Sequence, residues 1–255
     1  MRERLDTLLV ARGLFATRSQ ARAAVLAGEV SVAGRPSAKP GDLVDAASEL
    51  AVAERPRFVS RGGDKLSHGL AILGVSVEGE EACDLGSSTG GFVDCLLQHG
   101  AARVAAVDVG YGLLDYRLRT DPRVSVLERT NARALTADRL PFRPGFVTAD
   151  VSFISLRLAL APVLEFARAG YRGLVLVKPQ FEAGREQVGK GGIVRDPEAQ
   201  QMAVVRVTEA VKELGGTAIE TIESPILGAE GNREFLLHAR FGLGGVKLPA
   251  SPHEP

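Results

Sequence analysis

From Lys65 onward, apolar segments of strand length alternate with segments of helical periodicity. Expected strands lie at residues 81–85, 103–107, 124–127, 146–150 and 173–178. Helical patterns such as Gly91–Gln98 and Leu156–Ala169 fall between them, and this alternation predicts a parallel sheet covered on both faces. After a helix at 198–213, strands at 217–223 and 234–240 are joined by a loop too short for a crossover helix, so they should pair antiparallel. The predicted fold class is α/β, a Rossmann-like and mostly parallel sheet with an antiparallel last strand.

The first 52 residues have a different pattern, with two short helices followed by small strands. Helices are expected at Arg4–Val10 and Gln20–Ala27, and Thr17 can cap the second. A short strand is expected at Val30–Val32, after the glycine that ends the second helix. These features predict a small α+β domain that precedes the larger one.

Charge is unevenly distributed along the chain. The whole sequence has 31 basic and 31 acidic side chains, whereas residues 1–41 have seven basic and three acidic ones, a net charge of +4. Arg18 and Arg22 are four residues apart and therefore share one helix face. A basic face suits contacts with nucleic-acid phosphates, although an ordinary solvated surface explains the charge equally well. The expected organisation is a domain at 1–52, a basic linker at 53–64, a second domain at 65–243 and a disordered tail at 244–255.

The composition argues against several classes of protein. The two cysteines, Cys83 and Cys95, form no CxxC pair, and the four histidines are far apart, so no metal site is expected. Both thiols should be buried in a cytosolic protein. No segment reaches the roughly 20 apolar residues that span a bilayer, and the N-terminus lacks the apolar core of a signal peptide. The sequence therefore predicts a cytoplasmic protein without stable membrane association.

A turn of small residues, Gly-Ser-Ser-Thr-Gly-Gly, joins the strand at 81–85 to the helix that starts at Gly91. Such a turn lets a ligand approach the backbone closely, although a plain strand–helix connection can have the same composition. The dinucleotide pattern GxGxxG needs glycine where this chain has Ser88. Asp84 would repel a pyrophosphate but suits the cationic amino group of a methionine moiety. Asp108, after the next strand, can accept hydrogen bonds from both ribose hydroxyls of an adenosine.

The two acids favour S-adenosylmethionine (SAM) over NAD as the cofactor. The expected cofactor contacts are Asp84, Gly86, Ser87, Ser88, Thr89, Gly90, Gly91, Asp108 and Asn131. Asn131 could face the adenine, or it could be an ordinary loop residue. A second glycine-rich segment, Gly184–Lys190, is followed by Gly191 instead of the Ser or Thr of a P-loop. We interpret residues 183–195 as a flexible, basic substrate loop or a simple surface loop.

Two charged residues stand at the ends of expected strands, Asp150 at the end of 146–150 and Lys178 at the end of 173–178. In doubly wound sheets ligands bind at these carboxyl ends. Burying a lysine without a partner is unfavourable, so Asp150 is the expected partner of Lys178. A structural ion pair would explain the same two residues. Lys65 and Glu234, each taken alone, would be interpreted as surface charges.

Taken together, these residues resemble known families. The strings RLDTLLV, TRSQAR and AGEVSVAG near the N-terminus resemble an S4-type RNA-binding domain. The set Lys65, Asp150, Lys178 and Glu234 resembles the Lys-Asp-Lys-Glu tetrad of FtsJ-like ribose 2'-O-methyltransferases. The strings RGGDKL, DLGSSTGGF, TADVSFISL, LVKPQFEAG, GKGGIVRD and GNREF resemble the TlyA family of rRNA cytidine 2'-O-methyltransferases, which are also named hemolysins.

The resemblance implies a methyl transfer from SAM to a ribose 2'-hydroxyl of 16S or 23S rRNA, with ribosomal subunits as partners and no metal. It implies that Lys178 contacts the hydroxyl and that Asp150 and Glu234 orient the lysines. The implied RNA contacts are Arg4, Arg18, Arg22, Arg57 and Arg61.

Three other functions stay open at this point. A non-catalytic RNA-binding protein is disfavoured by the intact tetrad. A membrane-active hemolysin is disfavoured because the sequence has neither a spanning segment nor a strongly amphipathic basic helix. An NAD enzyme is disfavoured by Asp84 and Ser88.

Overall fold

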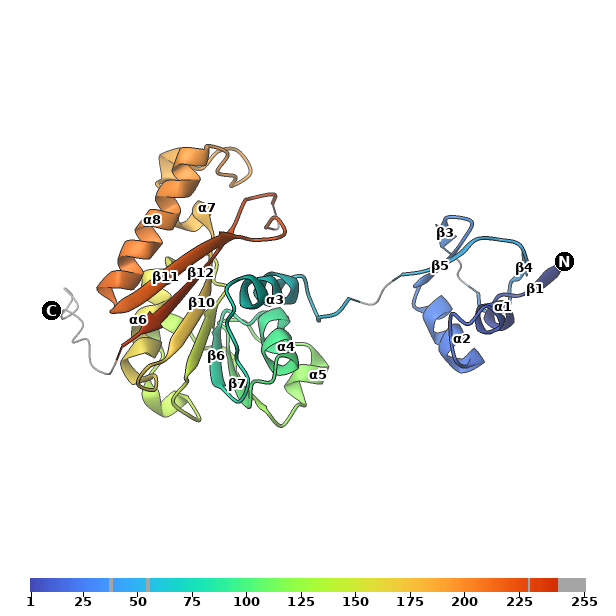
Figure 1. The fold of residues 1–255 in the computed structure, drawn as a ribbon, viewed down its shortest axis with the longest axis horizontal. Coiled ribbons are helices and arrows are strands. Elements are labelled where there is room, and N and C mark those ends of the chain that lie inside the picture. Colours follow the sequence, from blue (N-terminus) through green and yellow to red (C-terminus); the bar gives the residue numbers. More distant parts are fainter. Residues whose placement is uncertain (37–38, 54–55, 229, 243–255) are drawn as a thin grey trace. The chain divides into compact units, whose positions relative to one another are not determined.

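A computed structural model of the chain describes residues 1–36, 39–53, 56–228 and 230–242. The chain divides into two compact units, Met1–Pro56 and Arg57–Pro255 (Figure 1). The segment expected to link them at 53–64 is itself divided, because Phe58 is buried in the core of the second unit and a helix starts at Gly62. Residues 54 and 55 of that segment, and the tail expected at 244–255, lie outside the described residues.

The first unit consists of two helices and two small sheets. The helices are α1 (Leu5–Ala11) and α2 (Arg18–Leu26). The strands are β1 (Arg2–Arg4), β2 (Val30–Val32), β3 (Arg35–Pro36), β4 (Leu43–Asp45) and β5 (Leu50–Val52). β1 pairs antiparallel with β4, and β2 pairs antiparallel with β3 and β5. Thr17 accepts a hydrogen bond from the Gln20 amide, 3.3 Å, and so caps α2 as predicted.

The second unit is built on one sheet of seven strands in the order β11-β12-β10-β9-β6-β7-β8. The strands are β6 (Glu81–Leu85), β7 (Arg103–Val107), β8 (Val124–Leu127), β9 (Phe146–Ala149), β10 (Arg172–Val177), β11 (Gly216–Glu223) and β12 (Phe235–Phe241). Neighbours from β10 to β8 pair parallel, whereas β12 pairs antiparallel with both β10 and β11. The predicted α/β class with an antiparallel last strand is confirmed.

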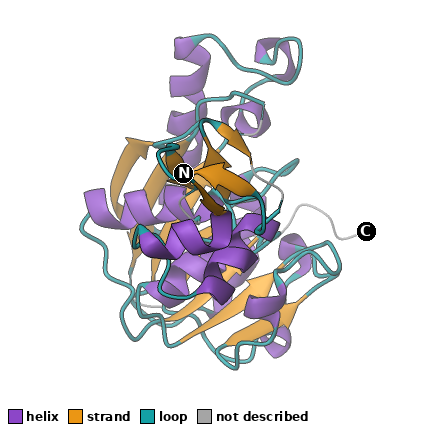
Figure 2. Ribbon diagram, turned by 90° about the vertical axis from the view of Figure 1, so that its right-hand side faces the viewer, coloured by secondary structure: helices purple, strands orange, loops and turns teal. Residues whose placement is uncertain are grey.

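Helices cover both faces of this sheet (Figure 1). They are α3 (Gly62–Ile72), α4 (Gly91–Gln98), α5 (Tyr116–Arg119), α6 (Leu156–Phe166), α7 (Pro179–Glu182) and α8 (Pro197–Glu213), with 3₁₀ turns η1 (Ala132–Ala134), η2 (Ala137–Arg139) and η3 (Arg185–Gln187). Side chains of α3, α4 and α5 form one core cluster with the sheet, and side chains of α6 and α8 form another. Successive strand residues point to opposite faces, so Ala82 belongs to the first cluster and Cys83 to the second. The segment between α7 and α8 lies beyond the strand ends, at the top of Figures 1 and 2.

Candidate active site

A cavity of about 300 Å³ opens at the carboxyl ends of β6, β9 and β10. This is the edge at which ligands bind in doubly wound sheets. The cavity is lined by Ser60, Arg61, Gly62, Lys65, Asp84, Gly86, Ser87, Ser88, Thr89, Gly91, Phe92, Asp150, Ser152, Lys178 and Glu234. All four residues of the expected tetrad and six of the nine expected cofactor contacts are therefore in one place.

The tetrad forms two ion pairs on the cavity wall. Lys65 of α3 and Glu234, just before β12, are buried, and the lysine Nζ lies 2.5 Å from Oε2 of Glu234. Lys178 and Asp150 follow β10 and β9, and the lysine Nζ lies 2.6 Å from Oδ1 of Asp150. The ammonium of Lys178 also donates to Oγ of Ser152, 3.0 Å. Asp150 is thus the partner of Lys178 that the sequence predicted, and each lysine has its charge balanced at a fixed position.

Asp84 is the buried acid of this cavity that lacks a full set of partners. It is 0% exposed, and its Oδ1 accepts a hydrogen bond of 2.7 Å from Oγ1 of Thr148, also buried, on β9. Among the described residues, no group donates to its Oδ2. The pKa of Asp84 is raised to about 7, chiefly by burial and also by the charges of Asp150 and Asp108, while the Thr148 hydrogen bond lowers it. A cationic group in the cavity would supply the missing partner and stabilise the ionised carboxylate.

The glycine-rich turn reaches the cavity because two of its glycines have no room for a side chain. Gly86 has φ +81°, and a Cβ there would lie 2.6 Å from the carbonyl oxygen of Asp150. A Cβ on Gly91 would overlap Oγ of Ser60. Ser88 also has a left-handed backbone, with φ +48°. The turn therefore presents backbone to the cavity at close range, as the sequence predicted.

Three expected cofactor contacts do not line the cavity. Gly90 faces away from it, since a Cβ there would overlap Leu118 of α5. The carboxylate of Asp108 accepts hydrogen bonds from the amides of Ser88, 2.8 Å, and Gly110, 2.7 Å, and thereby holds the turn. Asn131 is exposed and accepts a hydrogen bond of 3.0 Å from the Arg133 amide, so it caps η1 as an ordinary loop residue does.

An aromatic pair beside Lys178 was missed in the sequence. Phe153 is 91% exposed and has φ +63°, a conformation that is strained for an aromatic residue. Its ring lies 5.1 Å from that of Phe181, measured between centroids, and the Lys178 Nζ lies 6.0 Å from the Phe181 centroid. The two phenylalanines each follow a tetrad residue by three positions, at Asp150 and Lys178, and this repeated spacing could have indicated them.

Asn232 was also missed as a separate residue, although it lies in the string GNREF. It is buried, and its amide nitrogen donates to the carbonyl of Gly192, 2.9 Å, while its Oδ1 accepts from the amide of Val194, 3.0 Å. Gln200 of α8 donates to the carbonyl of Val194, 2.7 Å. The glycine-rich segment after α7 is therefore held by hydrogen bonds to the loop that carries Glu234.

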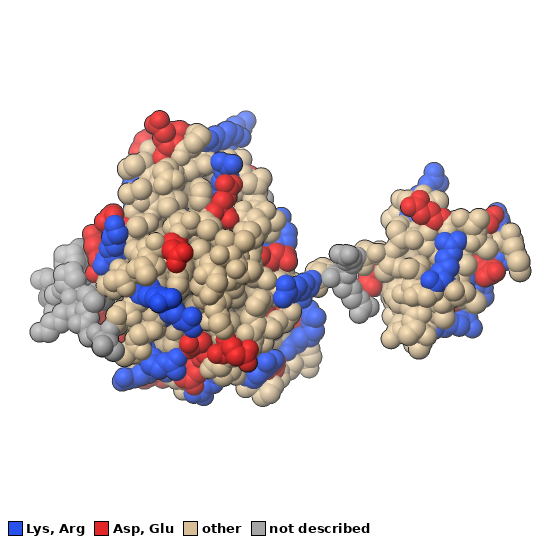
Figure 3. Space-filling model, in the orientation of Figure 1, with Lys and Arg blue, Asp and Glu red and all other residues tan. Residues whose placement is uncertain are grey.

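The arginines expected to contact RNA have different environments. Arg4 and Arg18 in the first unit are exposed, and each places a guanidinium nitrogen 3.1 Å from Oδ2 of the buried Asp6. Arg22 is exposed on the same helix as Arg18. Arg61 lines the cavity. Acidic and basic side chains are interspersed on the face drawn in Figure 3, so the charged side chains form no extended area of one sign there.

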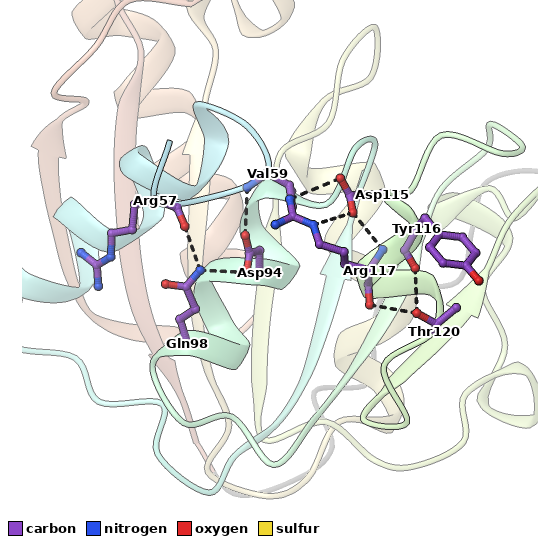
Figure 4. A network of polar contacts seen from close by, with 8 residues as sticks. All are labelled: Arg57, Val59, Asp94, Gln98, Asp115, Tyr116, Arg117 and Thr120. Carbon is purple, nitrogen blue, oxygen red and sulfur yellow. Dashed lines mark hydrogen bonds and ion pairs between the residues drawn. The ribbon is translucent and has the colours of Figure 1, made fainter. Parts of the chain in front are cut away.

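Arg57 is tied to the second unit. Its guanidinium lies 4.8 Å from the centre of the Phe58 ring, and its carbonyl accepts a hydrogen bond of 3.0 Å from Gln98 of α4 (Figure 4). Asp94 of the same helix accepts a hydrogen bond of 2.9 Å from the Val59 amide. These contacts fix the backbone that leads into α3 and to Lys65.

Two further expectations concern metals and membranes. Within the described ranges, no group of three or more His, Cys, Asp or Glu side chains is placed to hold a metal ion. No helix in the part of the chain that the structure describes is long and apolar enough to cross a membrane. Cys83 and Cys95 are free and buried, as predicted, and burial raises the pKa of both thiols.

Comparison with known proteins gives matches to both units. The model of the FtsJ-like methyltransferase family matches residues 58–241, and that of the S4 domain matches residues 3–50. The chain is 45% identical over 242 residues to the Mycobacterium tuberculosis protein named 16S/23S rRNA (cytidine-2'-O)-methyltransferase TlyA, covering 94% of this chain and 90% of that protein. It is 37% identical over 238 residues to hemolysin A of Brachyspira hyodysenteriae, covering 92% and 98%. The structure of a hemolysin-named Streptococcus thermophilus protein matches with a TM-score of 0.73 at 42% identity, covering 98% of this chain and 92% of the other.

The S4 match falls in the first unit and the FtsJ-like match in the second. The full-length relatives cover both units, so the similarity is not confined to one domain. The chain therefore belongs to the TlyA family and combines an S4 domain with an FtsJ-like methyltransferase domain.

Proposed function

We propose that this protein transfers the methyl group of SAM to a ribose 2'-hydroxyl of ribosomal RNA. The observation that carries the proposal is the cavity in which two lysine–carboxylate pairs lie beside the unpartnered oxygen of Asp84. The S4 domain supports an RNA substrate, and the relative from Mycobacterium tuberculosis is named for cytidine-2'-O-methylation of 16S and 23S rRNA.

The residues of the cavity fit SAM. When bound, SAM supplies an electrophilic methyl group on a sulfonium sulfur. The positively charged amino group of its methionine moiety would be the donor that Oδ2 of Asp84 lacks. The glycines at positions 86 and 91 leave room for a ligand against the backbone. Asp108 accepts hydrogen bonds from the Ser88 and Gly110 amides, and its oxygens retain lone pairs for ribose hydroxyls.

Lys178 and Asp150 are the pair that would act on the nucleophile. A ribose hydroxyl is a weak nucleophile at neutral pH, so the site must hold it in line and accept its proton. Asp150 and Ser152 fix the Lys178 Nζ at the cavity wall. The pair includes an ionised carboxylate and can therefore take up the hydroxyl proton while the oxygen–carbon bond forms and the carbon–sulfur bond breaks. The Lys65–Glu234 pair places a second ammonium nearby, which stabilises negative charge that develops on the oxygen.

Phe153 and Phe181 would support the base of the same nucleotide. An enzyme that modifies a nucleotide inside folded RNA must first expose it, and an exposed aromatic ring gives the freed base a surface to stack on. Phe153 is three positions after Asp150 in the chain. A base stacked on its ring would therefore keep the attached ribose close to the Lys178–Asp150 pair.

The proposal is tested by Lys178→Ala, with purified ribosomal subunits and SAM labelled in its methyl group. We expect the variant to fold, to bind SAM with unchanged affinity by calorimetry, and to lose methyl transfer by about 100-fold or more. Resistance of the product to alkaline hydrolysis at one position locates the methyl group on a ribose oxygen.

The matched control is Lys212→Ala, which removes an exposed lysine of α8 whose side chain pairs only with Glu209 among the described residues. It should methylate like the wild type. Wild-type activity in the Lys178 variant would contradict the role of that residue, and a methyl group on a base would contradict the proposed reaction.

A further inference from the structure

The loop between β7 and α5 exposes more large apolar side chains than its length requires. Val109, Tyr111 and Leu113 of this loop and Tyr116, the first residue of α5, have exposed side chains, with Tyr111 at 68% and Tyr116 at 76%. We call these four residues together with Arg129 the tyrosine surface. The ring of Tyr116 extends away from the Asp115–Arg117 ion pair at the start of α5 (Figure 4). Large apolar side chains exposed at several positions of one short segment mark a binding surface more often than scattered single ones do.

The loop is fixed to the turn that lines the cavity. At its start, Asp108 accepts a hydrogen bond of 2.8 Å from the Ser88 amide. At its end, the Asp115 amide donates to the carbonyl of Thr89, 3.1 Å. Between them, the buried Leu114 packs where a side chain on Gly90 would otherwise lie. The exposed rings are therefore carried on a backbone whose position is set by the cavity wall.

Arg129 adds a cation to the surface. Its guanidinium carbon lies 4.4 Å from the centre of the Tyr111 ring, and its amide donates to the carbonyl of Gly110, 3.0 Å. It adopts φ +50°, a strained conformation for a residue other than glycine. Among the described residues, no carboxylate lies within ion-pair distance of its guanidinium, whereas Arg117 and Arg119 pair with Asp115 and Glu128. The stacked Arg129 therefore keeps its charge available for a ligand.

We propose that the tyrosine surface binds single-stranded RNA next to the nucleotide that is methylated, with bases stacked on Tyr111 and Tyr116 and a phosphate at Arg129. Aromatic rings that hold bases, combined with arginines that hold phosphates, are the chemistry by which proteins bind single strands. An unpaired arginine beside exposed tyrosines favours a polyanion over an apolar protein partner. The strand that places its ribose in the cavity must leave across neighbouring surface, and the loop anchored at Ser88 and Thr89 provides it. This inference rests on the proposed function.

The test compares Tyr111→Ala and Tyr116→Ala with Tyr111→Phe and Tyr116→Phe, which retain the ring and remove only the hydroxyl. With purified ribosomal subunits as substrate, we expect each alanine variant to raise KM for the subunits about tenfold, the loss of one stacked base. The value of kcat and the affinity for SAM should stay unchanged, and both phenylalanine variants should behave like the wild type. Both tyrosine side chains are exposed, so thermal melting should show that all four variants are folded.

Arg129→Ala is tested separately by binding to a labelled single-stranded RNA oligonucleotide of mixed sequence at several salt concentrations. We expect the slope of log affinity against log salt concentration to decrease by about one, which corresponds to the loss of one phosphate contact. Unchanged KM in the alanine variants would overturn the inference, while wild-type methylation would leave the proposed function standing. A weaker affinity for SAM in those variants would also overturn it, because the loop would then hold the adenine. If the wild type methylates no RNA, the proposed function fails, and oligonucleotide binding still decides whether this surface takes RNA.

Discussion

The S4 unit and the methyltransferase unit each bury one aspartate completely, Asp6 and Asp84. The two carboxylates differ in how many hydrogen-bond partners they have and in the direction of their pKa shifts. In the S4 unit, Asp6 accepts hydrogen bonds from Arg4 at two positions, both 3.1 Å, and from Arg18 at 3.1 Å. These arginines hold the pKa of Asp6 well below its usual range, the hydrogen bond of Arg4 having the largest effect. In the methyltransferase unit, Asp84 has one hydrogen bond from Thr148 and one oxygen without a partner, and its pKa rises to about 7.

The difference is that Asp6 has a full set of hydrogen-bond partners within the protein, whereas one oxygen of Asp84 has none among the described residues and is free to bind a ligand. Asp6 has its hydrogen-bond partners inside the protein, so its charge stabilises the fold and fixes two exposed guanidinium groups. Asp84 is satisfied only in part, so its charge destabilises the folded protein until a cation arrives. Buried polar groups are nearly always paired in folded proteins, which makes an exception at a cavity informative about what binds there.

Asp84→Asn should have the largest effect. The amide keeps the acceptor for Thr148 but removes the charge that a methionine amino group needs, so the affinity for SAM should fall by about 100-fold or more, measured by calorimetry. The folded protein without SAM should become more stable. Because the folded pKa of Asp84 is above its unfolded value, the destabilisation is absent below about pH 4 and complete above pH 7.

The variant should therefore gain stability at pH 8 and little at pH 4. A shift of roughly three pKa units corresponds to about 4 kcal/mol. Urea unfolding of the methyltransferase unit at both pH values measures the gain. Equal stability of wild type and variant at pH 8 would show that Asp84 is already paired in solution and would contradict its contrast with Asp6.

Asp6→Asn should have the opposite effect on stability, and a smaller one. The variant weakens the hydrogen bonds from Arg4 and Arg18, and we expect the melting temperature of the S4 unit to fall by roughly 5–10 °C. The folded pKa of Asp6 is below its unfolded value, so its stabilisation is present above about pH 4 and is lost as the pH falls further. The melting difference between wild type and variant should therefore disappear in acid.

RNA binding by the Asp6→Asn variant shows whether Asp6 orients Arg4 and Arg18 or only neutralises their charge. The substitution raises the net charge of the unit by one, which by itself would strengthen binding to ribosomal subunits. If Asp6 positions Arg4 and Arg18, binding weakens despite the added charge. Tighter binding in a folded variant would show that Asp6 only neutralises the arginines. Asp42→Asn, at an exposed acid of the same unit, is the matched control.

The fold was predictable because its determinants are local. Apolar segments recur at strand length, and a short loop between two of them requires antiparallel pairing, so the position of β12 beside β11 followed from the sequence alone. Strand bounds differed by only a residue or so, as at β10, which starts at Arg172 and ends at Val177. Lys178 was conspicuous because a lysine rarely follows four apolar residues.

The pairings inside the site were harder to predict, because they join distant segments. Lys65 and Glu234 are 169 positions apart, and only the fold brings them together. Asp6 was counted as one acid in a basic region, although burial makes it the centre of that region. Asn131 and Asp108 were predicted to contact the cofactor from their positions, and only the structure shows that both also accept hydrogen bonds from neighbouring backbone amides. Residue type and spacing indicate which groups can react, and packing decides which of them are left unpaired.

Thr148→Val should have the smallest effect, and that effect should be a shift in the pH dependence of SAM affinity. Valine has the shape of threonine but lacks the hydroxyl that donates to Oδ1 of Asp84 at 2.7 Å, and this hydrogen bond lowers the pKa of the acid. Its loss should raise that pKa by about one unit, since a hydrogen bond to a charged group contributes about 1.5 kcal/mol or more.

SAM requires the ionised carboxylate, so wild-type affinity should fall about tenfold for each pH unit below 7, and the variant should show the same fall displaced to higher pH. Near pH 9 the two affinities should converge. A deficit that persists at pH 9 would mean that Thr148 shapes the cavity, and an unshifted pH profile would mean that Asp84 is not the acid that SAM meets.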